Sequence, residues 1–266
     1  MTETNGFVWV GLLLKVSHVL AGVLTLVSSC IAIVSSKGGT WHRRAGRWYV
    51  YAMLWITLSS FGLLLIRPNL FLFGVAMLTG YLTLSGYRVT PTANARGEGR
   101  HRRTLDWIIS LCGVAVGIGM TGWSVANLTG LITTLVRAPS NGELIPIPTG
   151  FLALTIFFGA MLLVNAVPDA IRVIRPTTDR RWWWFAHMNR MIGGYIAAIS
   201  AFLVQNVATH VPLQWSWLIW IAPTKISLRG GCYRGVVFDA RLHQFGVWES
   251  EGDRFRVSTY RCNKTD

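Results

Sequence analysis

The chain has 266 residues, of which 52% are hydrophobic and only 14% are charged. Soluble globular proteins carry about a quarter charged residues, so this composition excludes an ordinary soluble domain. The formal net charge of +14 could suggest nucleic-acid binding, but Lys and Arg concentrate in short segments beside apolar runs, which is typical of membrane proteins. We therefore predict the lipid bilayer, and not nucleic acid, as the partner of this chain.

Six apolar runs follow one another along the chain, and each is long enough to cross a bilayer. A helix of about 20 residues spans the hydrocarbon core. The predicted spans are residues 7–34, 48–66, 70–87, 106–135, 150–174 and 182–206. A further apolar run, residues 213–222, is too short to cross alone. The predicted fold class is all-α: a polytopic transmembrane helical bundle of six full spans plus a short or truncated seventh.

The segments outside the spans differ in character. Residues 137–149 hold three prolines and one glycine, so we expect an irregular loop there. From residue 224 onward charged residues become frequent, without a helical or strand period. We therefore divide the chain into a transmembrane bundle, residues 1–223, and a charged C-terminal tail, residues 224–266. We expect this tail to be disordered or to come from an aberrant reading frame.

The distribution of Lys and Arg predicts how the chain is threaded. The segments after the first, third and fifth spans hold thirteen of these residues, whereas those after the second and fourth hold only Arg67 and Arg137. Because basic loops stay in the cytoplasm, we predict a multi-pass protein of the cell (inner or plasma) membrane with its N-terminus outside. Anionic lipid headgroups are then the expected partners of the basic loops.

Ionisable residues inside the spans are candidates for a functional site, because each is costly in lipid unless it is paired or hydrated. Lys15 and His18 lie three residues apart, so they share a face of the first helix. His187 and Arg190 have the same spacing in the sixth span, which ends near Asn206. In the fifth span, the polar residues Asn165 and Asp169 flank Pro168.

Two classes of function fit these residues. A small-solute or ion carrier, or a sensor, would line a polar intramembrane cavity with Lys15, His18, Gln205 and Asn206. A membrane redox protein would instead bind haem or quinone through His42 and His187, which the threading places at the same inner side. Haem b would then have these two imidazoles as its iron ligands. Packing of His18 and solvation of His42 are the structural alternatives to both functions.

No motif of a known enzyme class stands in the sequence. A glycine-rich nucleotide loop, a nucleophile elbow and a zinc-protease helix are all missing from it. The sequence therefore leaves open whether the protein is an enzyme.

A set of short motifs along the chain resembles a known family. The residues that carry the resemblance are His18, Gly22, Lys37, His42, Gly46, Tyr49, Met53, Tyr81, Ser85, Gly86, Tyr87, Arg88, His187, Met191, Tyr195, Asn206, Trp220 and Pro223. From about residue 10 to residue 223 the chain resembles a bacterial family of multi-pass membrane proteins known as domain of unknown function 2306. The resemblance implies an integral membrane protein with about seven helices. It implies no activity, but it favours His18, His42, His187 and Asn206 as site positions.

Overall fold

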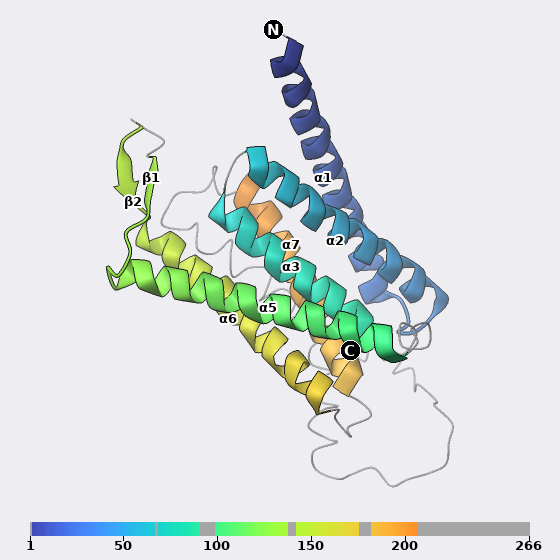
Figure 1. The fold of residues 1–266 in the computed structure, drawn as a ribbon. Coiled ribbons are helices and arrows are strands. Elements are labelled where there is room, and N and C mark those ends of the chain that lie inside the picture. Colours follow the sequence, from blue (N-terminus) through green and yellow to red (C-terminus); the bar gives the residue numbers. More distant parts are fainter. Residues whose placement is uncertain (1, 67–68, 91–98, 138–141, 176–181, 207–266) are drawn as a thin grey trace, which may run out of the picture. The chain divides into compact units, whose positions relative to one another are not determined.

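The computed structural model describes residues 2–66, 69–90, 99–137, 142–175 and 182–206 of the chain. Within these ranges lie six long helices and one pair of short antiparallel strands, which we call the hairpin (Figure 1). The elements in chain order are α1 Thr2–Val34, α2 Thr40–Ile66, α3 Leu70–Arg88, α5 Gly99–Leu128, β1 Leu135–Arg137, β2 Leu144–Pro146, α6 Thr149–Ile174 and α7 Trp182–Asn206. The predicted all-α class is confirmed, with the hairpin as the only sheet in the described ranges.

Four of these helices are long and apolar enough to cross a membrane, over Trp9–Val34, Thr40–Ile66, Thr104–Leu128 and Thr149–Ile174. Large apolar side chains on them point away from the bundle; Leu13 is 67% exposed and Val164 is 64% exposed. Apolar surface of this extent favours lipid over water as its surroundings. The chain is therefore a membrane protein.

The finer prediction of six full spans plus a seventh is met only in part. The two helices α3 and α7 form where the sequence predicted spans, but neither belongs to the four apolar helices. In α7 the polar residues His187, Asn189 and Arg190 lower the apolar character. The short run at residues 213–222 and the tail at residues 224–266 lie outside the described residues.

The fourth helix ends earlier than the sequence suggested. The predicted span reached residue 135, but α5 ends at Leu128. Two residues later Gly130 has φ +73°, a left-handed conformation that favours glycine and ends helices. The apolar residues beyond it enter β1, where Val136 pairs with Ile145 of the antiparallel β2. The loop that we expected to be irregular therefore contains part of a short hairpin between α5 and α6 (Figure 1).

The helix α3 is the centre of the described bundle, since it contacts α2, α5, α6 and α7. The two outer pairs, α1 with α2 and α5 with α6, have the most extensive contacts. Small residues allow the second pair to approach: a Cβ on Gly159 would lie 2.9 Å from the carbonyl oxygen of Gly117. In membranes this close backbone contact replaces the hydrophobic driving force that packs helices in water.

The first halves of α2 and α7 also meet. Tyr49 is 3% exposed, and its hydroxyl donates to the carbonyl oxygen of Met191 at 3.2 Å. A Cβ on Gly194 would lie only 2.7 Å from that hydroxyl oxygen, so glycine is needed for the contact. Because α2 and α7 are joined here, the residues at the starts of both helices lie in one region of the protein.

Candidate functional site

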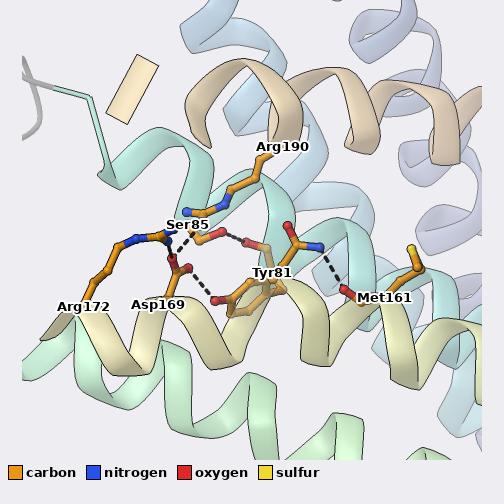
Figure 2. A network of polar contacts seen from close by, with 7 residues as sticks. Tyr81, Ser85, Met161, Asp169, Arg172 and Arg190 are labelled. Carbon is orange, nitrogen blue, oxygen red and sulfur yellow. Dashed lines mark hydrogen bonds and ion pairs between the residues drawn. The ribbon is translucent and has the colours of Figure 1, made fainter. Parts of the chain in front are cut away.

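A buried carboxylate links three helices. Asp169 of α6 is 9% exposed, and its Oδ2 accepts a hydrogen bond from the Tyr81 hydroxyl of α3 at 2.6 Å. Its Oδ1 accepts from Arg190 of α7 at 2.5 Å and from Arg172 of α6 at 3.2 Å. Figure 2 shows the carboxylate between the two guanidinium groups and the tyrosine ring. We call Tyr81, Asp169, Arg172 and Arg190 the Asp169 cluster.

Local sequence explains how α6 presents two of these groups. Asp169 and Arg172 are three residues apart, so both side chains lie on one face of the helix. Pro168 stands inside the helix directly before Asp169 and cannot donate a backbone hydrogen bond. The guanidinium of Arg172 also lies 4.6 Å from the ring centre of Trp182, a cation–π contact that joins the end of α6 to the start of α7.

Glycine in α3 allows Arg190 to reach the carboxylate from α7. A Cβ on Gly86 would lie 2.9 Å from Cβ of Arg190 and 3.2 Å from Cε of Met191. The two helices therefore approach at this glycine more closely than any larger residue would permit. The neighbouring Ser85 hydroxyl donates to the carbonyl oxygen of Tyr81 at 2.7 Å, so it does not compete for Asp169 (Figure 2).

The guanidinium of Arg190 is buried but only partly satisfied. The residue is 4% exposed, and its Nη2 is bonded to Asp169. Its Nη1 is also buried and finds no hydrogen-bond partner among the described residues. A buried donor without a partner costs about 1–3 kcal/mol, and more when it is charged. The cluster holds two guanidinium groups and one carboxylate, so its formal charge is positive and one strong donor group remains unused.

The two histidines of the redox hypothesis lie near each other and have matching hydrogen bonds. Nδ1 of His42 lies 2.9 Å from the carbonyl oxygen of Ala32, and Nδ1 of His187 lies 2.9 Å from that of Gly86. A carbonyl oxygen only accepts, so each Nδ1 is the donor and each neutral ring keeps its lone pair on Nε2. The imidazole of His42 is also close enough to act electrostatically on that of His187. We call these two residues the histidine pair.

Three other predicted site residues lie elsewhere in the described bundle. Nδ1 of His18 lies 2.9 Å from the hydroxyl of Ser59 on α2, which itself donates to the carbonyl oxygen of Trp55 at 2.7 Å. Lys15 is exposed on α1. Asn206 is exposed at the end of α7, where its amide donates to the carbonyl oxygen of Phe202 at 2.7 Å. Among the described residues, no hydrogen bond or ion pair joins these three to the Asp169 cluster.

Sequence reasoning identified Arg190 and noted Asp169, but it missed that the two form an ion pair with Tyr81 as a third member. A useful signal was present, since Asp169 is the only acidic residue inside the apolar run of α6 and an acid in lipid needs a cationic partner. Groups of three or more metal-ligating side chains are missing from the described ranges. The Asp169 cluster and the histidine pair are therefore the two candidate sites.

Comparison of the chain with known proteins identified no relative. No family model, no curated protein and no solved structure matches the chain. The resemblance to domain of unknown function 2306 stays a prediction, and the geometry of the two sites is the basis for the function proposed below.

Proposed function

We propose that the protein is a multi-pass membrane carrier that exchanges small carboxylate anions, with Arg190 as the group that binds the anion. Six spans, an external N-terminus and cytoplasmic basic loops in the cell membrane are part of this proposal. One observation carries it: Arg190 is a buried cation whose Nη2 is paired with Asp169, while Nη1 has no partner in the described part of the bundle.

The chemistry of the cluster supports an anionic carboxylate as the ligand. A guanidinium presents its N–H groups in a planar fork that matches the two oxygens of a carboxylate. Asp169 already occupies part of this fork, so it acts as an internal counter-ion when no solute is bound. An incoming monoanion would balance the remaining positive charge of Arg172 and Arg190 and satisfy the free Nη1.

The position of the cluster also suits a carrier. Arg190 and Asp169 belong to different helices, α7 and α6, and Tyr81 of α3 donates a hydrogen bond to Asp169. Ionisable groups buried between membrane helices commonly mark a path for ions or solutes. A solute carboxylate bound at Nη1 would draw the Arg190 guanidinium away from Asp169. This would loosen the link between α6 and α7, which is the event that a carrier needs before it can open to the other side.

Exchange of radiolabelled lactate in liposomes that contain the purified protein tests this function. Arg190→Lys keeps the charge but loses the planar fork, so we expect binding to weaken about tenfold or more. The double variant Asp169→Asn/Arg190→Gln removes both charges, which is tolerated better than removal of one, and it should exchange no lactate. Arg175→Gln is the matched control, since Arg175 is an exposed arginine at the end of α6.

The outcomes separate the carrier from other roles. Exchange by the double variant at the rate of the unmodified protein would overturn the proposal. Saturable lactate binding without exchange would show a sensor and would also contradict a carrier. Loss of exchange in Arg175→Gln as well as in the Arg190 variants would show an unspecific effect of positive charge.

The hydrogen bonds of the histidine pair favour a second candidate function, a redox protein that holds haem b or quinone. In metal sites a ligating histidine commonly donates its other ring N–H to a carbonyl or carboxylate. His42 and His187 both have this arrangement, with Nε2 left as the ligand atom. A visible spectrum of the purified protein tests it: a Soret band that disappears in His187→Ala would support haem, and a colourless protein would remove the haem form.

A further inference from the structure

A hollow of about 370 Å³ lies beside the first turns of α2. It is lined by Arg44, Arg47, Trp48 and Tyr51, and we call these four residues the arginine hollow. Their spacing of three, four and seven residues places them on one face of the helix. Trp48 is 59% exposed and Tyr51 is 61% exposed, so this face points away from the bundle.

The two arginines of the hollow are free to bind a ligand. Within the described ranges no acidic side chain pairs with either Arg44 or Arg47. Two other basic groups nearby already have partners: Lys37 donates to the carbonyl oxygens of Ala32 and Ile33, and His42 is bonded to Ala32 as well. The neighbouring Arg43 is exposed and lies outside the hollow. Two unpaired guanidinium groups beside a hollow form a site for a phosphate, which accepts forked hydrogen bonds from arginine.

An apolar face continues from the hollow along α2. Beyond Trp48 and Tyr51 it exposes Trp55 at 45% and Leu58 at 62%. From Trp48 to Leu58 the helix rises about 15 Å, which is half of the ~30 Å hydrocarbon core and so the depth of one leaflet. The hollow therefore offers, in order, a cationic end, two amphipathic rings and an apolar track for one acyl chain.

We propose that the arginine hollow is a binding site for one anionic phospholipid, with the phosphodiester at Arg44 and Arg47 and an acyl chain along Trp55 and Leu58. The site lies on the outer face of α2 and is separate from the Asp169 cluster, so it goes beyond the proposed carrier function. Charge alone would attract many lipids to a basic surface. The order of groups along one helix face, first cationic, then aromatic and then apolar, selects a single lipid and fixes its orientation.

Native mass spectrometry of the full chain, titrated with phosphatidylglycerol or phosphatidylcholine in detergent, tests this site. We expect one phosphatidylglycerol to be retained more tightly than phosphatidylcholine. Arg44→Gln and Arg47→Gln should each weaken its retention about tenfold because each removes a charge-assisted hydrogen bond. Arg43→Gln is the control, since this exposed arginine carries the same charge and lies outside the hollow.

Each outcome decides the proposal. Equal losses in all three variants would show diffuse attraction and overturn a defined site, as would equal retention of the two lipids. Inorganic phosphate at millimolar concentration should not displace the lipid; displacement would identify a soluble phosphate as the ligand. Far-ultraviolet circular dichroism of each variant verifies that the helices are intact. Because this binding needs no solute, its failure would leave the carrier proposal unaffected, and the reverse also holds.

Discussion

The ion pair between Asp169 and Arg190 yields a prediction about the order in which single variants lose stability. Asp169→Asn keeps the shape of the side chain and removes its charge. Arg190 then has no anionic partner, although its side chain is only 5% exposed. Arg190→Gln leaves Asp169 with two donors, Tyr81 and the more exposed Arg172. We therefore expect Asp169→Asn to be the more damaging of the two.

The burial of the ion pair also determines how much free energy of unfolding each variant loses. Removal of one partner from a buried ion pair costs about 3–5 kcal/mol, because the other charge stays buried. We expect about 3 kcal/mol for Asp169→Asn, since the amide oxygen still accepts a hydrogen bond. For Arg190→Gln we expect about 1–2 kcal/mol, because Tyr81 and Arg172 keep the carboxylate hydrogen-bonded. In the double variant the remaining charge of the cluster, Arg172, has a side chain that is 34% exposed. The double variant therefore leaves no deeply buried charge without a partner and should lose less than Asp169→Asn alone.

Equilibrium unfolding by dodecyl sulfate in mixed micelles measures these free energies. The four proteins form a double-mutant cycle, which isolates the interaction between the two side chains. Arg175→Gln, at the exposed end of α6, is expected to stay within about 0.5 kcal/mol of the unmodified protein. Losses of the single variants that simply add in the double variant would refute the ion pair, as would a larger loss for Arg190→Gln than for Asp169→Asn.

Three further predictions address the packing and the threading. Gly86→Ala should destabilise the bundle by about 1–3 kcal/mol, because its methyl group would overpack against Arg190. Gly119 has open space around it, so Gly119→Ala should instead stabilise α5 by about 0.5–1 kcal/mol. Thermal unfolding of the two variants measures both effects. A double-mutant cycle on His18 and Ser59 should give a coupling of about 0.6–1 kcal/mol, and zero coupling would contradict their hydrogen bond. A tag within residues 88–103 should be reached only from the cytoplasm, and access from outside intact cells would overturn the threading.

The helices could be predicted from the sequence because each apolar run is about as long as a membrane span and holds few ionisable residues. All six described helices cover most of their predicted ranges. The end of α5 was misplaced because residues 131–136 are mostly apolar and look like a continued span. A single left-handed glycine, Gly130, ends the helix there instead. The end of a helix at a single glycine is hard to predict when the residues after it are mostly apolar.

The candidate site could be predicted only in part. Local sequence patterns do not show which helices, far apart in the sequence, pack against each other. Arg190 was identified as costly in lipid, and its partner Asp169 lies 21 residues earlier on another helix. Lys15 was expected to face a cavity with His18, but the two differ by about 60° around α1. This difference is enough to expose Lys15 while His18 reaches Ser59.

Solid-state nuclear magnetic resonance provides the most direct test of the central claim, that a solute carboxylate binds the buried guanidinium of Arg190. The measurement is the dipolar coupling between carboxyl-labelled lactate and guanidinium nitrogens in the protein reconstituted in lipid. We predict a coupling that corresponds to hydrogen-bonding distance and disappears in Arg190→Lys. A coupling of unchanged strength in Arg190→Lys, or none in the unmodified protein at saturating lactate, would contradict the claim.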